Sequence, residues 1–413
     1  MRNVMNILLI NHYVGSLKYG MEYRPYYLAK EWIKMGHRVT LIGASFSHLR
    51  IQQPININEV FVQEKIDGID YIWLKTPAYK TAIARSWNIF VFVLRLSKYV
   101  KKVSKLVKPD LVVASSTYPL DIYPARKIAK MSGAKLCYEV HDLWPLSPKL
   151  IGGYSSWHPF ILVMQLAENY AYKHVNKVIS LLWNAEQHMR EHGLAEGKFK
   201  CIPNGYCKED WENLNLKEEI PQTHKLLFKQ LENKIIVGFA GGFAASGSLD
   251  TLVKAAALLK ENDSLSFVFV GKGLEQEYLE KLVKEYSLSN VFFLPAVKKM
   301  QVPWVIVHFD IAFMGGVHSK LHFYGTSYNK LTDYMLSAKP IVQAIDEPNS
   351  VVERVGCGIC VEAENSRLVA DAILELVGMS REEREKMGER GKKYTLENLE
   401  WGILAKQFLN AMK

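Results

Sequence analysis

The first half of the chain alternates short apolar runs with amphipathic segments. Segment 22–36 places apolar residues at helical spacing and ends at a glycine, which predicts a helix. The apolar runs are typical of buried strands, expected at 6–13, 37–45, 110–116, 134–140 and 177–182. Strand–helix–strand alternation of this kind indicates a parallel sheet covered by helices on both faces.

The pattern restarts near residue 234, where "KIIVGFAGG" (234–242) reads as a new strand that ends in two glycines. Helices are expected at 249–262 and 274–287, and further strands at 265–273, 290–295, 309–316, 339–345 and 357–363. The predicted fold class is therefore α/β, with two Rossmann-like, doubly wound parallel-sheet domains facing across a cleft. Ligands of such sheets bind at the carboxyl ends of the strands.

A polar, turn-rich stretch separates the two halves and predicts a linker at 201–225. We expect an N-terminal domain over 1–200 and a C-terminal domain over 226–385. The last segment, 386–413, is expected to form helices that pack back on the N-terminal domain.

Composition fits an ordered globular protein, because 49% of the 413 residues are hydrophobic and 23% are charged. The first apolar run, "ILLI", follows a single Arg and leads into polar residues, so we interpret it as a buried strand and not as a signal peptide. No stretch approaches the roughly 20 apolar residues that span a bilayer. We therefore expect a chain that does not cross a membrane.

Five cysteines occur, and only Cys357 and Cys360 have C-x-x-C spacing. A structural zinc site needs about four ligands, so small buried strand residues fit this pair better than a redox or metal site does. Free thiols suit a reducing cytoplasm.

The net charge of +10 concerns partners more than fold. No nucleic-acid-binding signature accompanies it, so nucleic acid is not an expected partner. Part of the excess lies in segment 95–110, where basic residues recur at helical spacing opposite apolar ones. Two interpretations stay open, a solvated helix face or a helix that rests on anionic lipid headgroups. The residues proposed for the membrane contact are Trp87, Arg95, Lys98, Lys102 and Lys105, with Phe90 and Phe92 nearby.

Polar groups cluster where a first-half strand ends, in "YEVHDLWP" (138–145). Glu139, His141 and Asp142 follow one another there, and a histidine beside acids can serve as a positioned donor or base. A satisfied structural histidine is the alternative. Metal binding is not expected, because three ligands in one short stretch are weak support for a site.

In the second half, "FAGG" and "VGKG" end strands in glycines, which would allow a ligand to approach the backbone. Neither motif is a dinucleotide fingerprint, because Ser246 and Gln276 stand where a third glycine is required, and no Walker lysine pattern occurs. A nicotinamide oxidoreductase or a P-loop ATPase is thus disfavoured, whereas a ligand that carries phosphate is not.

"GTSYNKLTDYM" (325–335) places small polar residues ahead of Lys330 and Asp333 at an expected helix start. One interpretation is a capped helix with Leu331, Tyr334 and Met335 on its buried side. The other is an anion site formed by the first amides of the helix, its dipole and Lys330.

Together these motifs resemble the GT-B glycosyltransferases of family 4, over nearly the whole chain. "GMEYR", "SFSHLR" and "EVHDLWP" look most like the bacterial N-acetyl-L-fucosamine transferases of O-antigen and capsule assembly. In that family the segment around Lys330 is an E-x7-E motif, which binds the donor sugar, the ribose and the diphosphate. Here Gly325 stands at the first acid and Asp333 at the second.

The resemblance implies that the N-terminal domain binds the acceptor and the C-terminal domain binds the donor. It assigns catalytic roles to His141, Lys330 and Asp333. Acceptor contacts fall on Glu22, Arg24, Glu139 and Asp142. Donor contacts fall on Gly241, Gly242, Gly271, Gly273, Pro295, Gly325, Thr326, Ser327, Asn329, Lys330 and Asp333. No cation follows the "FAGG" strand as in many members, so Lys330 is the expected substitute beside the diphosphate.

The predicted function is transfer, with retention of configuration, of an N-acetylated hexosamine or deoxyhexosamine from a UDP-sugar to a lipid-linked saccharide. No cofactor or metal is expected, since helix amides and Lys330 would stabilise the diphosphate. We expect a cytoplasmic protein, peripheral on the inner face of the plasma membrane. A UDP-sugar 2-epimerase and a non-catalytic GT-B scaffold remain alternatives.

Overall fold

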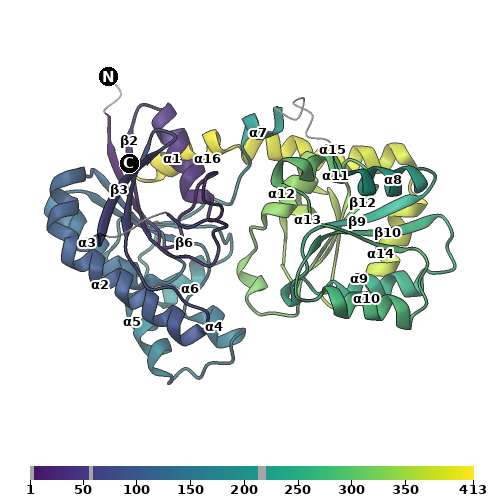
Figure 1. The fold of residues 1–413 in the computed structure, drawn as a ribbon, viewed down its shortest axis with the longest axis horizontal. Helices are drawn as coiled ribbons and strands as arrows, with labels where there is room; N and C mark the ends of the chain where they lie inside the picture. Colours follow the sequence, from purple (N-terminus) through teal and green to yellow (C-terminus); the bar gives the residue numbers. More distant parts are fainter. Residues whose placement is uncertain (1–3, 55–58, 213–219) are drawn as a thin grey trace. The chain divides into compact units, whose positions relative to one another are not determined.

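The computed structural model describes residues 4–54, 59–212 and 220–413, which divide into two compact units (Figure 1). Unit 1 comprises Met1–Asn204 with Trp401–Lys413, and unit 2 comprises Gly205–Glu400. Residues 213–219 of the predicted linker lie outside the described residues. The rest of that stretch contains the end of β8, all of α7 (Lys208–Glu212) and the start of α8.

Unit 1 is built on a sheet of eight described strands in the order β3-β4-β2-β1-β5-β6-β7-β8. Every neighbouring pair is parallel except β3 with β4. The strands are β1 (Asn6–Ile10), β2 (Arg38–Ala44), β3 (Phe61–Ile66), β4 (Ile69–Leu74), β5 (Leu111–Ala114), β6 (Lys135–Val140), β7 (Lys177–Ser180) and β8 (Phe199–Cys201).

The antiparallel pair β3–β4 is the part of unit 1 that the strand–helix pattern does not predict. Asp67 and Gly68 join the two strands, and both have positive φ, at 50° and 82°. A two-residue hairpin turn of that hand matches the twist of the strands, and Asp-Gly is a preferred sequence for it. The dipeptide, flanked by alternating apolar residues, is the signal that predicts this hairpin.

Helices cover the sheet of unit 1, and its last helix comes from the far end of the chain. The indole Nε1 of Trp32 donates to the carbonyl of Ala405 at 3.1 Å, and the rings of Trp32 and Phe408 lie 5.2 Å apart. The helices are α1 (Arg24–Lys34), α2 (Ala82–Val107), α3 (Ile122–Ser132), α4 (Leu146–Leu150), α5 (Pro159–His174), α6 (Glu186–Glu191) and α16 (Trp401–Ala411).

Unit 2 contains a sheet of six described strands, all parallel, in the order β11-β10-β9-β12-β13-β14. The strands are β9 (Ile235–Gly242), β10 (Leu265–Lys272), β11 (Val291–Leu294), β12 (Ile311–Gly315), β13 (Ile341–Ala344) and β14 (Gly358–Val361). The helices are α8 (Gln222–Gln230), α9 (Asp250–Leu258), α10 (Gln276–Glu285), α11 (Val302–Ile306), α12 (Asn329–Leu336), α13 (Val351–Val355), α14 (Ser366–Gly378) and α15 (Arg381–Asn398).

Two separate apolar cores lie on the two faces of this sheet. Residues of α9, α10 and α14 pack on one face, and residues of α8, α11, α12 and α13 pack on the other, as Figure 1 shows. The prediction of two parallel-sheet α/β domains is therefore confirmed.

Candidate active site

The strand order reverses between β9 and β12 in unit 2 and between β1 and β5 in unit 1. Sheets of this type bind ligands at such reversals, beyond the carboxyl ends of the strands. Each unit therefore has one position at which a site is expected, and the polar residues predicted from the sequence lie close to it.

In unit 2 the helix α12 is fixed to the end of β9 by a side chain. β9 pairs with β12 only through Val237 and Gly238, so the amide of Ala240 has no partner from that strand. It donates instead to the buried hydroxyl of Tyr334 at 3.0 Å. This bond aligns α12 so that its first turn lies beside the glycines that end β9.

Lys330 lies in that first turn and turns toward the strand ends. Its ammonium is 4.6 Å from the ring centre of Phe239, and a Cβ on Gly241 would lie 3.6 Å from Nζ. Burial lowers the pKa of Lys330 to about 8. Burying an ammonium is costly, the aromatic ring offsets part of that cost, and groups whose pKa is shifted in this way concentrate at functional sites.

The amino end of α12 has no side-chain cap among the described residues, and the loop before it is held by hydrogen bonds to Glu347. Within the described chain, no side chain caps α12 at Tyr328, so the amides of its first turn can bind an anion. Thr326 is already engaged, because its amide and hydroxyl donate to Glu347 at 2.9 and 2.5 Å. Gln343 also donates to Glu347, at 3.2 Å. Thr326 thus shapes the loop between Gly325 and the helix.

Asp333 lies three residues beyond Lys330 on the same helix. Burial raises the pKa of Asp333 to about 7, and the nearby charge of Lys299 opposes that rise. The carboxyl group therefore changes charge close to neutral pH. Ser327 lies two residues before α12, and Asn329 is its first residue.

The glycines at the strand ends differ in how much space surrounds them. A Cβ on Gly271 would meet the carbonyl oxygen of Gly241 at 1.8 Å, and one on Gly273 would meet that of Phe243 at 2.0 Å. These two glycines are required by the protein's own neighbouring backbone, and their predicted donor contacts stay a prediction. Gly242 is exposed and has no atom within 4 Å of a Cβ, so it does leave space.

Pro295, predicted to contact the donor, is exposed just beyond β11. Its carbonyl accepts from Nε2 of the buried His224 of α8 at 3.0 Å. That bond fixes the loop that follows β11.

In unit 1 the predicted polar cluster is built around an ion pair. Arg24 and Glu139 are 1% and 0% exposed, with a nitrogen–oxygen distance of 3.0 Å. Arg24 also donates to the carbonyls of Ile202 and Pro203, at 2.9 and 2.7 Å. Burial alone would raise the pKa of Glu139, but Arg24, His141 and Ser115 hold it at about 2. This enclosed position favours a supporting role for both residues over a direct contact with an acceptor.

His141 lies at the outer side of this pair. Its Nε2 is 3.2 Å from the Glu139 carboxylate and 3.0 Å from the Ser115 hydroxyl, and its side chain is 13% exposed. An ionised carboxylate can only accept, so Nε2 carries the proton toward Glu139 and Nδ1 is left as the accepting nitrogen.

The two other predicted acceptor residues have different surroundings. Asp142 accepts from the amide of Leu143 at 2.9 Å and from the hydroxyl of Ser147, and thereby shapes the turn before α4. Glu22 is partly exposed, and its backbone bonds to Gly15 and Tyr13 in the loop after β1.

A group of polar side chains around the cation Arg85, beside the strand-order reversal of unit 1, was not predicted from the sequence. Arg85 of α2 donates to the Tyr13 hydroxyl at 3.1 Å, and Nδ1 of His48 lies 2.6 Å from the Tyr79 hydroxyl. The rings of Tyr13 and His48 lie 5.9 Å apart, and no carboxylate pairs with Arg85 within the described ranges. These residues come from separate segments of no recognisable motif, so only the fold brings them together.

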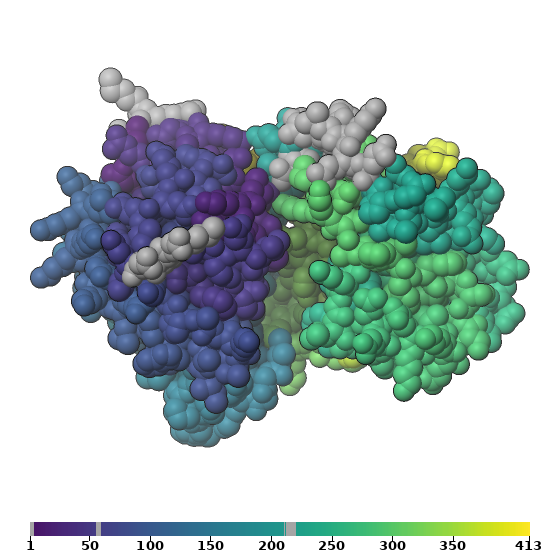
Figure 2. Space-filling view, viewed as in Figure 1, coloured from purple at the N-terminus to yellow at the C-terminus, as the bar shows by residue number. Residues whose placement is uncertain are grey.

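The surface of α2 differs from the predicted basic face. Ile83, Trp87 and Leu94 are 84%, 60% and 62% exposed, and they share one helical stripe with the exposed Lys98, Lys101 and Lys105. Helix α2 lies on the near side of unit 1 in the view of Figure 1, and Figure 2 shows that same face in space-filling form. No helix in the described part of the chain is long and apolar enough to cross a bilayer.

Two of the predicted membrane residues, and the nearby Phe92, turn away from this stripe. The Lys102 ammonium lies over the ring of Phe61 at 4.0 Å, and Nη1 of Arg95 is buried. Phe92 is fully buried against His12. The exposed stripe therefore excludes these three and includes Lys101.

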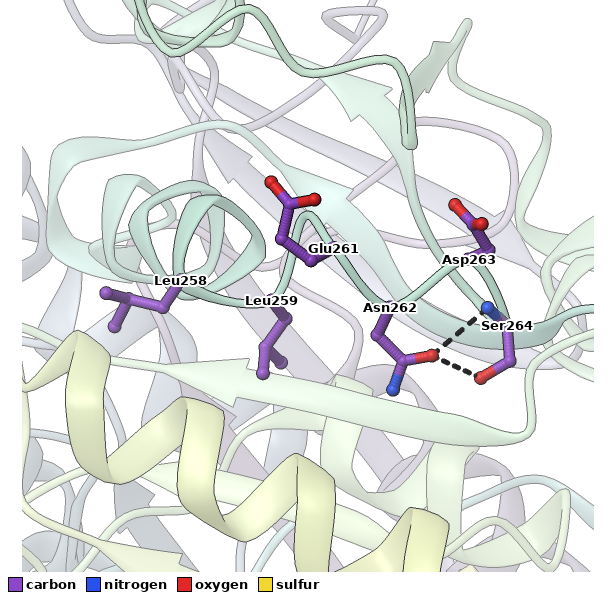
Figure 3. Close-up of a pocket in the computed structure, with 6 residues that line it drawn as sticks. All are labelled: Leu258, Leu259, Glu261, Asn262, Asp263 and Ser264. Atoms are coloured by element: carbon purple, nitrogen blue, oxygen red, sulfur yellow. Dashed lines mark hydrogen bonds between the residues drawn. The ribbon is translucent and has the colours of Figure 1, made fainter.

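A shallow pocket elsewhere in unit 2 does not belong to the site. It lies between the end of α9 and the start of β10, at the opposite ends of the strands (Figure 3). Its polar lining includes Glu261 and Asp263, and Asn262 accepts from the amide and hydroxyl of Ser264 at 3.1 and 2.6 Å. Two acids and a closed turn do not suit a diphosphate.

Comparison with known families identifies the chemistry that this arrangement serves. Residues 19–209 match Glycosyltransferase Family 4, and residues 224–394 match Glycosyl transferases group 1. The chain is a group 1 glycosyltransferase with a Family 4 domain. The two matched ranges contain most of the groups described above, including Lys330 and Asp333 in the second and Arg24 and His141 in the first.

Individual relatives of this glycosyltransferase are distant. WcaI of Escherichia coli (strain K12), named as a colanic acid biosynthesis glycosyl transferase, is 22% identical over 96% of this chain and 99% of its own. Anabaena Alr3699/HepE, solved with UDP and glucose, has a TM-score of 0.67 at 16% identity, covering 99% of each chain. Sucrose-phosphate synthase from Thermosynechococcus elongatus has a TM-score of 0.70 at 15% identity, covering 98% of this chain and 97% of its own. These structures share the GT-B fold.

Proposed function

We propose that this glycosyltransferase moves a sugar from a UDP-sugar to a lipid-linked saccharide in bacterial surface polysaccharide synthesis, with retention of configuration. The observation that carries the proposal is the Lys330 ammonium, held over Phe239 beside the uncapped start of α12. The sugar is an N-acetylated hexosamine or deoxyhexosamine, as the fucosamine-transferase resemblance implies. HepE was solved with UDP, which supports a UDP-linked donor, and WcaI is named for colanic acid biosynthesis, which supports a role in polysaccharide synthesis.

The donor groups follow from the contacts in unit 2. The amides of the first turn of α12 and the Lys330 ammonium bind the diphosphate and stabilise the negative charge that develops as it leaves. Asp333 accepts from the ribose hydroxyls. Gly242 leaves room for the donor beside the end of β9.

The acceptor groups follow from unit 1. His141, whose outer nitrogen is an acceptor, faces the reacting hydroxyl, while Glu139 and Arg24 hold the ring in that tautomer. Arg85 and His48 bind the phosphates of a lipid-linked acceptor. Arg85 and the exposed Ile83–Trp87–Leu94 stripe belong to the same helix, α2, and the stripe rests on the lipid and its anionic headgroups at the inner face of the plasma membrane.

A donor screen tests this function. Thermal shifts with UDP-, GDP- and dTDP-sugars identify the nucleotide, and UDP release is then measured with and without a lipid-linked saccharide. If the protein transfers the sugar, UDP release should depend on the presence of the lipid-linked saccharide. Conversion of the donor to an epimer without an acceptor would identify an epimerase, and the absence of any turnover would identify a binding scaffold.

Donor affinity is expected to be strongest between about pH 7 and pH 8. Ribose binding favours the carboxylate of Asp333, whose pKa of about 7 makes affinity fall as the pH drops below it. Diphosphate binding favours the ammonium of Lys330, whose pKa of about 8 makes affinity fall as the pH rises above it. Calorimetry with a UDP-sugar, whose diphosphate does not titrate in this range, measures the profile. Asp333→Asn should flatten the acid side and Lys330→Met the alkaline side, whereas a flat wild-type profile would contradict both assignments.

Vesicle binding tests the α2 surface. Replacing Lys98, Lys101 and Lys105 by Glu should weaken binding to vesicles containing anionic lipid on the order of 100-fold, since each lysine contributes about 1 kcal/mol at such a surface. A matched variant changes the exposed Lys260, Lys281 and Lys284 of unit 2 to Glu and carries the same change in charge. Equal loss in both variants, or none in the first, would remove the membrane contact from α2.

A further inference from the structure

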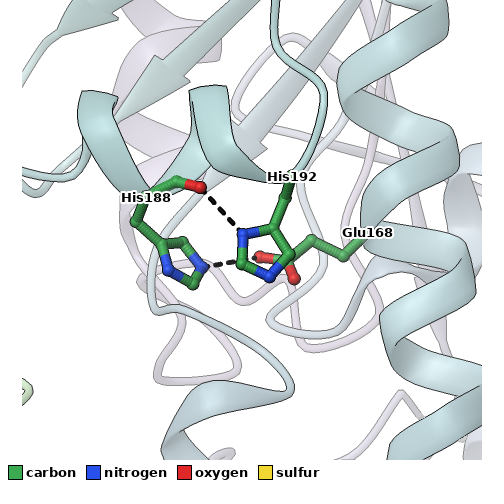
Figure 4. Close-up of side chains that lie close together, drawn as sticks. All are labelled: Glu168, His188 and His192. Carbon is green, nitrogen blue, oxygen red and sulfur yellow. Dashed lines mark hydrogen bonds and ion pairs between the residues drawn. The ribbon is translucent and has the colours of Figure 1, made fainter.

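We propose that unit 1 binds a Zn²⁺ ion at Glu168, His188 and His192, none of which is assigned a role in glycosyl transfer (Figure 4). Glu168 lies on α5, His188 lies on α6, and His192 is the residue that ends α6. One potential ligand atom from each of the three lies within 4.8 Å of the others. No other metal-ligating group of three occurs within the described ranges.

The local sequence places both imidazoles on one side of α6. "HMREH" (188–192) separates them by four residues, which brings two side chains together across one helical turn. Their ring centres are 4.3 Å apart. Glu191, between them in sequence, is engaged elsewhere, because it accepts from Gln187 at 3.0 Å.

The distance between His188 and Glu168 fits a shared metal better than a direct bond. Nε2 of His188 lies 3.4 Å from Oε1 of Glu168. A direct N–H···O hydrogen bond is usually about 2.7–3.2 Å long. Two ligands of a tetrahedral zinc, each bonded at about 2.0–2.1 Å, are separated by about 3.3 Å. Zn²⁺ could therefore enter between these atoms with small side-chain movements.

The second histidine is held in the tautomer that a metal requires. Nδ1 of His192 lies 2.8 Å from the carbonyl oxygen of His188. A carbonyl can only accept, so Nδ1 carries the proton and the lone pair is on Nε2. Figure 4 shows the rings of His188 and His192 gathered with the Glu168 carboxylate. A backbone carbonyl on the far nitrogen is the usual support of a metal-binding histidine.

The carboxylate is oriented by its own partners. Tyr172 donates to Oε1 of Glu168 at 2.9 Å, and Gln165 donates to Oε2 at 2.7 Å. Glu168 is 1% exposed and His188 is 8% exposed, whereas His192 is partly open to solvent. Two imidazoles and a carboxylate form a donor set that Zn²⁺ prefers, with water as the fourth ligand. The bound ion would tie α6 to α5.

Zinc titration of the metal-free, tag-free protein tests the site. A chromogenic chelator in competition reports affinity and stoichiometry, Co²⁺ in place of Zn²⁺ reports tetrahedral geometry by its visible absorption, and a melting curve reports stabilisation. We expect one tight equivalent, visible Co²⁺ bands and a higher melting temperature. His192→Gln, at a partly exposed position, should weaken Zn²⁺ binding by at least about tenfold and abolish the bands.

His174→Gln is the matched control. Nδ1 of His174 also lies 2.8 Å from a carbonyl oxygen four residues back, that of Tyr170, but His174 is not in the metal-ligating group. This variant should bind Zn²⁺ as the wild type does. Failure of the wild type to take up a tight equivalent, or equal losses in His174→Gln and His192→Gln, would overturn the proposal without affecting the proposed glycosyl transfer.

Discussion

Lys330→Ala is expected to lower kcat for sugar transfer by about 10²–10³, the usual loss when one preorganised donor to a developing negative charge is removed. The described contacts place the ammonium over Phe239 beside Gly241, at the start of α12. The helix amides remain, so the variant should retain weak turnover. Initial rates of UDP release with saturating donor and acceptor measure the change.

Lys339→Ala provides the control for this result. Lys339 follows the same helix and is also partly buried, but its ammonium donates to the carbonyl of Val307 at 2.8 Å and does not reach the strand ends. Its removal should leave kcat within about twofold, because it has no part in stabilising the leaving diphosphate. If Lys330→Ala kept the wild-type rate and donor affinity, the diphosphate would have to bind elsewhere.

Arg24→Met is expected to destabilise unit 1 by about 3–5 kcal/mol, because it leaves the Glu139 carboxylate buried without its cation. Methionine keeps most of the volume of the side chain, so the loss reports charge and hydrogen bonding more than packing. Urea unfolding followed by tryptophan fluorescence measures the change in the transition of unit 1. Arg24→Met/Glu139→Leu, which removes both charges, should recover part of the loss.

The stability that the Arg24–Glu139 pair contributes depends on pH. The folded-state pKa of Glu139, about 2, lies below its ordinary value of 4.5, so the pair contributes stability above pH 4.5 and loses it progressively as the pH falls toward 2. In Arg24→Met this acid dependence should shrink.

Lys254→Met is the control for Arg24→Met. Lys254 and Asp250 form an ion pair at 2.7 Å in which the side chains are 40% and 24% exposed. A pair so open to solvent contributes less than about 1 kcal/mol. Comparable losses of stability in the two variants would show that burial of the Arg24–Glu139 pair does not increase its contribution.

The periodic part of the fold follows from the sequence because buried parallel strands need continuous apolar runs. The runs at 234–242 and 265–273 correspond to β9 and β10. The β3–β4 hairpin is different, since its strands pair antiparallel with no helix between them and its signal is the single turn Asp67–Gly68. Strand–helix alternation alone therefore does not predict this hairpin.

The candidate site was predictable where one segment carries several of its groups. The segment 325–335 holds Lys330 and Asp333 in one helical turn, and their spacing alone places them together. The burial of Arg24 could not be predicted, because its partners Glu139 and Ile202 lie more than a hundred residues away. The reason for Gly271 could not be predicted either, because its side chain is excluded by the backbone of the neighbouring strand, and that strand pairing is known only from the fold.

The position of α16 affects the order in which the two units can finish folding. Unit 1 is discontinuous, since residues 401–413 complete it after all of unit 2 has been synthesised. Trp32 is therefore synthesised 373 residues before Ala405, whose carbonyl accepts the hydrogen bond from its indole. The second unit can finish folding first, reversing the usual order of folding during synthesis, and a chaperone would meet the first unit with this apolar surface still uncovered.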